Sequence, residues 1–117
     1  MKNKSISDLN VKIFADGADI SGMMEMYSKP YIMGLTTNPT LMKMAGISDY
    51  KSFALDVLSK ITDKPISFEV FSDDFYEMED QALEISSLGS NVYVKLPVTN
   101  TKSEPIYNLI DKLSNQN

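Results

Sequence analysis

The chain alternates between short apolar segments and longer stretches in which apolar residues recur every three or four positions. The short segments are rich in β-branched and aromatic residues and are bounded by Gly, Pro, Asp or Asn, which is typical of β-strands. The longer stretches have the period of amphipathic α-helices. The predicted strands are residues 11–15, 31–35, 66–70 and 92–96.

Helix boundaries are predicted from capping residues, prolines and glycines. Pro39 suits the first position of a helix that Gly46 ends, and Gly89 suits the position just after a later helix. The polar residues expected to cap the helices are Asp19 or Ser21, Asn38, Ser48 and Ser72. The apolar residues of a last helix are Ile106, Leu109, Ile110 and Leu113.

The alternation of strand and helix predicts an α/β fold with a parallel sheet and right-handed crossovers. Because successive side chains of a strand point to opposite faces, Asp16, Glu69 and Lys95 fall on equivalent faces of their strands. Each of them also stands where a predicted strand ends. The carboxyl ends of parallel strands form the ligand-binding edge of α/β proteins, so we expect these side chains to form one site.

The amino-acid composition of the chain excludes several classes of function. The 117 residues carry a net charge of −5 and every basic residue is a lysine, so the basic footprint of a nucleic-acid-binding protein is absent. The chain contains no cysteine or histidine, which excludes disulfides, thiolate zinc sites, imidazole metal sites and histidine-dependent nucleophiles. No clustered carboxylates demand a metal ion, and we expect no metal and no cofactor.

Hydropathy predicts no membrane partner. Residues 1–10 are polar and lack the apolar region of a signal peptide, and no apolar stretch approaches the roughly 18 residues of a transmembrane helix. We therefore expect a cytoplasmic location. The length fits one domain, in which residues 1–10 form a polar N-terminal extension.

Lys95 is the candidate nucleophile of the expected site. A lysine amine whose pKa burial lowers from about 10.4 can condense with a ketone or aldehyde, and the Schiff base is then an electron sink for C–C cleavage. Glu69 can activate water or shuttle protons, and Asp16 can accept a proton from a substrate hydroxyl. The structural alternatives are a solvent-directed lysine, a salt bridge of Glu69 to Lys95 or Lys12, and a turn capped by Asp16.

Three polar residues near the end of the second strand are candidate substrate contacts. Asn38 can hydrogen-bond substrate hydroxyls or simply cap the helix that begins at Pro39. Thr36 and Thr37 can serve either purpose. The Asn-Pro-Thr sequence alone is a weak turn signal.

Four segments together resemble the transaldolase family, including its short fructose-6-phosphate aldolase-like branch. They are Ile13–Asp16 with Asp19, Gly34–Thr40, Phe68–Val70 and Val94–Thr99. The second segment matches the family's Gly-x-Thr-Thr-Asn-Pro-Ser/Thr signature, and the Val-Lys-Leu-Pro of the fourth is similarly specific. The likeness covers about residues 11–112. Glutamate at position 69 fits transaldolases better than the aldolase branch, which tends to carry glutamine there.

This resemblance implies a (β/α)₈ barrel and a transferase that moves a dihydroxyacetone unit between sugar phosphates. The reaction is of the sedoheptulose 7-phosphate and fructose 6-phosphate type, in the pentose phosphate pathway. By the same likeness, Lys95 forms the Schiff base, Asp16 handles the proton of C–C cleavage and Glu69 organises the catalytic water. Thr36 and Asn38 contact substrate hydroxyls.

The chain departs from the family in length. An eight-fold barrel needs roughly 200 residues or more, whereas four βα units are predicted here, so the chain looks like the N-terminal half of the barrel. The family's later strands supply a threonine near the water and the serine and arginine that hold the phosphate. A half-barrel leaves two sheet edges and an apolar face uncovered. We therefore expect a homo-oligomer or a complementing C-terminal half as partner.

Two other interpretations compete with an active enzyme. A receiver-like signalling domain has a similar length and acids at strand ends. It needs five strands, paired acids after the first strand and an aspartate after the third, where this chain has Glu69. The second alternative is a non-catalytic half-barrel that keeps the motifs without activity, because half of the barrel and the phosphate contacts are missing.

Overall fold

The computed structural model describes residues 3–116, so residues 1–2 of the predicted N-terminal extension lie outside the described residues. The strands are β1 (Ile13–Asp16), β2 (Ile32–Thr36), β3 (Ile66–Glu69) and β4 (Val92–Lys95). The α-helices are α1 (Ile20–Tyr27), α2 (Pro39–Met44), α3 (Tyr50–Lys60), α4 (Phe75–Ser86) and α5 (Tyr107–Ser114). A short 3-10 helix, η1 (Ile6–Asp8), precedes β1 within the extension.

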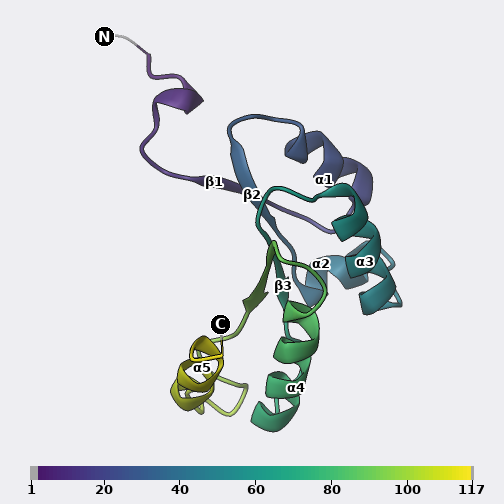
Figure 1. Ribbon diagram of the computed structural model, residues 1–117, viewed down its shortest axis with the longest axis vertical. Coiled ribbons are helices and arrows are strands. Elements are labelled where there is room, and N and C mark those ends of the chain that lie inside the picture. Colours follow the sequence, from purple (N-terminus) through teal and green to yellow (C-terminus); the bar gives the residue numbers. More distant parts are fainter. Residues whose placement is uncertain (1–2, 117) are drawn as a thin grey trace.

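The strands form one parallel sheet in the order β1-β2-β3-β4 (Figure 1). The predicted α/β fold with parallel βα units is therefore confirmed. This is the order of successive strands in a (β/α)₈ barrel, whereas a doubly wound receiver-type sheet follows the order 2-1-3-4-5. The receiver-like interpretation is therefore wrong. The sheet is not closed, and β1 and β4 are its two edge strands.

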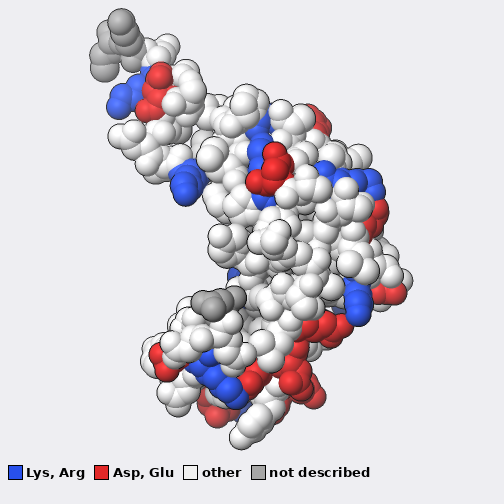
Figure 2. All heavy atoms as spheres, in the orientation of Figure 1, with Lys and Arg blue, Asp and Glu red and all other residues white. Residues whose placement is uncertain are grey.

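Helices cover one face of this sheet and leave the other open. Figure 1 shows α1, α2, α3 and α4 along one side of the strands, while α5 lies beside α4 at the far end. A salt bridge of 2.7 Å from Lys112 Nζ to Glu79 Oε1 joins α5 to α4. The space-filling view shows a crescent that is hollowed on the uncovered side (Figure 2). The four βα units thus form a curved half-shell.

The hydrophobic core lies between the sheet and its covering helices. Leu35 of β2 and both Ile66 and Phe68 of β3 are fully buried there. The helical side of the core is supplied by Phe53, Ala54 and Val57 of α3 and by Met78, Ala82 and Ile85 of α4. These residues follow the predicted helix period, because only that spacing keeps an apolar stripe on one side of a helix. The opposite strand face is left for the polar residues.

Two predicted helix starts are confirmed. The side chain of Asp19 accepts a hydrogen bond from Gly22 N and caps α1, and Asn38 caps α2 with Pro39 in its first turn. Gly46 follows α2 with a φ of 76°, a conformation that glycine adopts without steric cost. The backbone of these two short helices is thus fixed by local sequence.

Three other predicted boundaries are wrong. Asp49 rather than Ser48 caps α3, and Asp74 rather than Ser72 caps α4 by accepting hydrogen bonds from two backbone N–H groups. A carboxylate is a strong cap, and in both cases it lies one or two residues nearer the helix. Gly89 does not end α4, because that helix ends at Ser86 with Ser87 as its C-cap.

The strands begin or end one or two residues away from their predicted limits. β1 starts at Ile13 instead of residue 11 and includes Asp16, and β2 runs one residue later than predicted, to Thr36. Within the described residues, no helix combines the length and apolar character needed to cross a membrane. The cytoplasmic location stays a prediction.

Candidate active site

Strand register places the polar residues of the carboxyl ends in two rows on the open face. The first row across the sheet is Asp16, Thr36, Ser67 and Tyr93. Two residues farther along, Glu69 of β3 is paired with Lys95 of β4. Because strand side chains alternate, both rows share the face that the helices leave uncovered. The structure therefore brings the three predicted catalytic residues to one edge of the sheet.

Lys95 and Glu69 form an ion pair at the ends of neighbouring strands. Lys95 Nζ lies 3.7 Å from Glu69 Oε2, and the two side chains are 38% and 26% exposed. Of the structural alternatives for Glu69, the salt bridge to Lys95 is thus the one that forms. The same contact puts a carboxylate within proton-transfer reach of an amine through one water.

Asp16 is held by its neighbour on β2. Thr36 Oγ1 donates a 2.8 Å hydrogen bond to Asp16 Oδ1, and the backbone N–H of Gly17 donates to Thr36 O at 3.0 Å. These contacts continue the β1–β2 pairing past the end of the strand. The hydrogen bond to the hydroxyl leaves the second carboxylate oxygen of Asp16 as an acceptor for a ligand.

Asn38 caps a helix with its side-chain oxygen, while its side-chain NH₂ group is available as a hydrogen-bond donor. Its Oδ1 accepts a 2.9 Å hydrogen bond from Leu41 N, at the start of α2. An amide group also carries an NH₂ donor, and within residues 3–116 no hydrogen bond uses Asn38 Nδ2. Capping and substrate contact are therefore compatible roles for this residue.

Thr37 occupies a different environment from its neighbours. It is fully buried, and its Oγ1 has no hydrogen-bond partner within the described residues. Its backbone N–H donates to Ser67 O at 3.2 Å, which extends the β2–β3 ladder. The structure does not bring the Thr37 side chain to the open face, so its predicted substrate contact stays a prediction without support from this geometry.

A pocket of about 530 Å³ opens at these strand ends. Its walls include Asp16, Asn38 and Glu69, together with Pro97 and the residues that follow β3. Lys95 does not line this pocket, but its Nζ forms the ion pair with the lining residue Glu69. Nowhere along residues 3–116 do three or more His, Cys, Asp or Glu side chains gather as metal ligands. The chemistry of the pocket is that of an amine, carboxylates and an amide.

Tyr50 is a site neighbour that the sequence analysis missed. Its hydroxyl donates a 2.7 Å hydrogen bond to the backbone carbonyl of Glu69. Its ring lies 5.5 Å from the ring of Phe71 and 6.3 Å from that of Phe68, measured between centroids. Burial, with the Glu69 carboxylate as a second cause, raises the pKa of Tyr50 well above its usual value. No local pattern marks this contact, because it joins the start of α3 to the end of β3.

Two further contacts connect the loops above the sheet. Asp73, before α4, accepts hydrogen bonds from Thr101 Oγ1 at 2.6 Å and from Thr101 N at 2.7 Å. These hydrogen bonds lower the pKa of the Asp73 carboxyl. The loop after β4, which follows Lys95, is thereby attached to the loop after β3, which follows Glu69. The Lys95–Glu69 ion pair is therefore supported by contacts between these loops as well as by the strands.

Comparison with known proteins agrees with this geometry. The model of the family described as Transaldolase/Fructose-6-phosphate aldolase matches residues 13–117. A probable transaldolase of Dehalococcoides mccartyi is 37% identical over 106 residues, which cover 91% of this chain and 47% of the relative. A probable transaldolase of Thermoplasma volcanium is 39% identical over 108 residues, covering 92% of this chain and 47% of the relative.

The chain spans about half the length of the curated relatives it matches. The matched half carries the four βα units whose strands end at Asp16, Thr36, Glu69 and Lys95. The sequence resemblance to transaldolases is confirmed by the family match and by the parallel sheet. This chain belongs to the transaldolase/fructose-6-phosphate aldolase family.

Proposed function

We propose that this protein is a Schiff-base transferase of the transaldolase type, which moves a three-carbon dihydroxyacetone unit between sugar phosphates. The observation that carries the proposal is the Lys95–Glu69 pair, 3.7 Å apart, in which Glu69 lines a pocket together with Asp16 and Asn38. Family membership supports the reaction class. The proposed donors are ketose phosphates such as fructose 6-phosphate and sedoheptulose 7-phosphate.

Lys95 starts the proposed reaction. Its neutral amine adds to the C2 carbonyl of the ketose to give a carbinolamine, which loses water and becomes an iminium ion. Glu69 is the group closest to these proton transfers, because its carboxylate already lies beside Nζ. It accepts the proton that the ammonium group gives up, and returns one to the departing hydroxyl.

Asp16 acts at the bond that breaks. Its carboxylate accepts the proton of the C4 hydroxyl while the C3–C4 electron pair moves into the iminium group, so an aldose leaves and an enamine stays on Lys95. The hydrogen bond from Thr36 Oγ1 holds one Asp16 oxygen in place and leaves the other for this proton. The enamine then attacks the aldehyde of the acceptor, and water finally hydrolyses the new imine.

Substrate hydroxyls are the proposed partners of Asn38 and Thr36. Asn38 Nδ2 can donate to a hydroxyl while its Oδ1 remains the α2 cap. The chain has no arginine, so within it a substrate phosphate has lysine, hydroxyl and backbone N–H groups as donors. This proposal concerns the reaction of the family, to which the present chain contributes the lysine and both carboxylates.

The test is borohydride trapping with fructose 6-phosphate, followed by peptide mass spectrometry. Reduction converts the imine into a stable secondary amine, so we expect a three- or six-carbon adduct on Lys95 that is absent in Lys95→Met. Lys60→Met is the matched control, because Lys60 forms a surface ion pair with Asp56 on α3, away from the pocket. Labelling spread over many lysines, or none at all, would contradict the proposal.

A non-catalytic or partner-dependent half-barrel is the alternative that the open sheet favours. The ion pair stays partly exposed on the uncovered face, where water competes with substrate. Under this alternative, trapping fails with the chain alone. It succeeds only after addition of the C-terminal half of a relative such as the Dehalococcoides mccartyi protein. The two trapping experiments run side by side separate the two functions.

A further inference from the structure

The residues that follow β3 form one wall of the pocket. Val70, Phe71 and Ser72 line it together with Glu69, the last residue of the strand. Strand alternation puts Phe71 on the same face as Glu69, two residues earlier. Phe71 is 61% exposed, although its side chain is large and apolar. It is therefore a residue of the pocket wall and not of the hydrophobic core.

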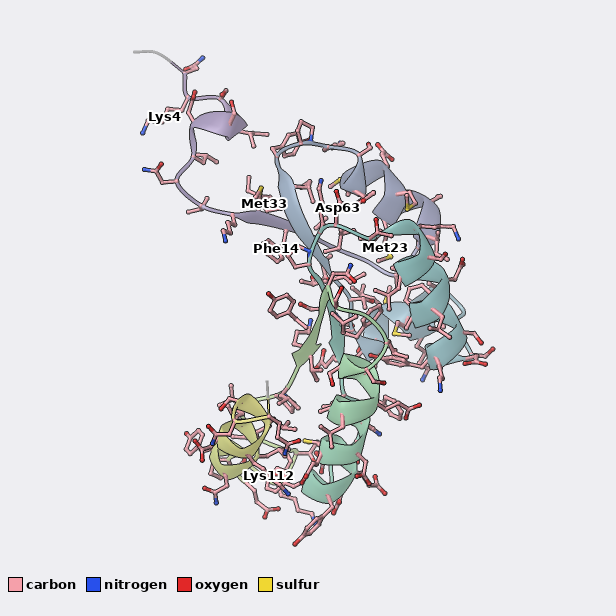
Figure 3. All side chains as sticks on the ribbon, viewed as in Figure 1. Lys4, Phe14, Met23, Met33, Asp63 and Lys112 are labelled. Atoms are coloured by element: carbon pink, nitrogen blue, oxygen red, sulfur yellow. The ribbon has the colours of Figure 1, made fainter. Side chains whose placement is uncertain are left out.

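The same alternation is visible at the first strand. Figure 3 shows Phe14 of β1 on the side of the strands away from the helices, whereas Met23 of α1 lies on the helical side. Asp16, two residues after Phe14, shares the uncovered face and lines the pocket. Asp16 and Phe71 therefore reach the pocket from the same face of the sheet, one from the end of β1 and one from just beyond β3.

Gln81 of α4 holds the backbone of this wall. Its Oε1 accepts hydrogen bonds from the N–H of Phe71 at 3.0 Å and from the N–H of Ser72 at 3.1 Å. The preceding N–H, that of Val70, donates to Lys95 O at 3.2 Å and so continues the pairing of β3 with β4. Three successive N–H groups after β3 therefore have fixed partners, and the side chain of Gln81 is the acceptor for two of them.

The side chains of the wall are held as well as its backbone. The ring of Phe71 packs on that of Tyr50, with centroids 5.5 Å apart and planes inclined by 40°, a tilted arrangement that aromatic pairs favour. Ser72 Oγ donates to Glu77 Oε2 at 2.5 Å and accepts from Asp74 N at 3.1 Å. The contacts come from α3, β3 and α4, which are consecutive elements of the chain, so one α-β-α segment fixes the position of the ring.

We propose that the Phe71 ring contacts the substrate by packing against carbon-bound hydrogens of the sugar, and that Gln81 is the positioning residue that holds this ring in the pocket wall. The inference rests on the proposed function, because it takes a sugar phosphate as the ligand. Ligand pockets combine apolar and aromatic walls with a few polar groups that fix orientation. Asp16 and Asn38 supply polar groups here, and Phe71 supplies the aromatic surface.

Removal of the Phe71 ring tests the contact. The ring transfers no proton, so it binds the ground state and the transition state equally, and its loss changes half-saturation without changing the maximum rate. We expect Phe71→Ala to raise the concentration of fructose 6-phosphate that half-saturates Lys95 trapping by about tenfold. Tyr76→Ala is the matched control, because it removes an 83% exposed ring of α4 outside the pocket wall. Unchanged half-saturation in folded Phe71→Ala would overturn the contact.

Two substitutions of Gln81 separate positioning from helix stability. Glutamate and methionine have similar length and both favour helices, but only glutamate keeps an oxygen that accepts the two N–H groups. We expect Gln81→Met to raise the half-saturating concentration several-fold and to speed exchange of the Phe71 and Ser72 amides, because their acceptor is lost. Gln81→Glu is expected to keep both quantities near the wild-type values. Equal effects of the two folded variants would overturn the positioning role.

A variant that forms no imine separates this contact from the chemistry. In Lys95→Met, we expect fructose 6-phosphate to shift the NMR signal of the Phe71 amide in a saturable manner, and inorganic phosphate, which has no carbon skeleton, to leave it unchanged. An equal shift with inorganic phosphate would overturn the contact.

The two proposals fail in different ways. If wild type is trapped at Lys95 while the Phe71 amide does not respond to fructose 6-phosphate in Lys95→Met, the contact is overturned and the proposed reaction stands. If the amide responds and wild type is not trapped, the contact stands and the Schiff-base function is overturned. Absence of both signals would overturn both.

Discussion

The hydroxyl of Tyr50 donates a 2.7 Å hydrogen bond to the backbone carbonyl of Glu69. Tyr50 is the first residue of α3, and Glu69 is the last residue of β3. The contact fixes the helix start against the point where the strand leaves the sheet. The carboxylate of Glu69, 3.7 Å from Lys95 Nζ, projects from this same residue. Tyr50 is therefore a positioning residue for the Lys95–Glu69 pair.

Tyr50→Phe is expected to reduce the free energy of unfolding by about 1 kcal/mol at neutral pH, since one hydrogen bond is lost while the ring remains. The raised pKa of Tyr50 gives this contribution a pH dependence. The unfolded chain loses the phenol proton near pH 10.0 and the folded protein holds it longer, so wild-type stability falls as pH rises above that value. Denaturant titrations of wild type and Tyr50→Phe between pH 8 and 11 measure the difference in their free energies of unfolding. No such difference is expected between wild type and Tyr76→Phe.

Gly34→Ala is expected to destabilise the sheet by about 1–3 kcal/mol, because it overpacks the β1–β2 contact. A Cβ at Gly34 would lie 2.7 Å from the Phe14 ring and 2.9 Å from the backbone oxygen of Pro65. The ring can shift, but the backbone oxygen cannot. Gly17→Ala is the control, because its Cβ would meet nothing within 4 Å. Urea unfolding that shows equal midpoints for both variants would refute the argument.

Thr37→Val separates two roles of a buried hydroxyl. The Oγ1 atom is buried without a partner in the described residues, and such a group costs about 1–3 kcal/mol. Replacement by a methyl group is therefore expected to leave stability unchanged or to raise it by about 1 kcal/mol. The yield of the Lys95 adduct is expected to be unaffected. A folded variant that traps less substrate would instead support the predicted substrate contact of Thr37.

Asp73→Ala is expected to release the loop after β4, because both hydrogen bonds from Thr101 are lost. Hydrogen exchange of the Thr101 amide measures this, with Asp80→Ala on α4 as the control. Because the pKa of Asp73 is lowered in the folded protein, its hydrogen bonds with Thr101 contribute their full stabilisation above pH 3.8. This stabilisation is lost as the pH falls through the lower pKa that Asp73 has in the folded state. Protection of the Thr101 amide that is the same in wild type and Asp73→Ala would contradict this role.

Local sequence determined the elements and the face of the site. Apolar runs and helical periods are set by neighbours within a few residues, so four strands and five helices could be predicted in the right order. Strand alternation is equally local, which is why Asp16, Glu69 and Lys95 were assigned to one face. The caps at Ser48 and Ser72 were wrong because an aspartate follows each within two residues, and aspartate and serine are about equally preferred as caps, so residue preference alone does not choose between them.

Tertiary structure decided which residues meet. Register pairs Glu69 with Lys95 and Asp16 with Thr36, and register depends on how whole βα units pack rather than on any segment. The same packing buries Thr37 while it leaves Thr36 on the open face, and brings Tyr50 to Glu69 across 19 residues. The sequence by itself determined the chemistry of the site and its side of the sheet. Its distances and its supporting contacts follow from long-range packing, which no local pattern encodes.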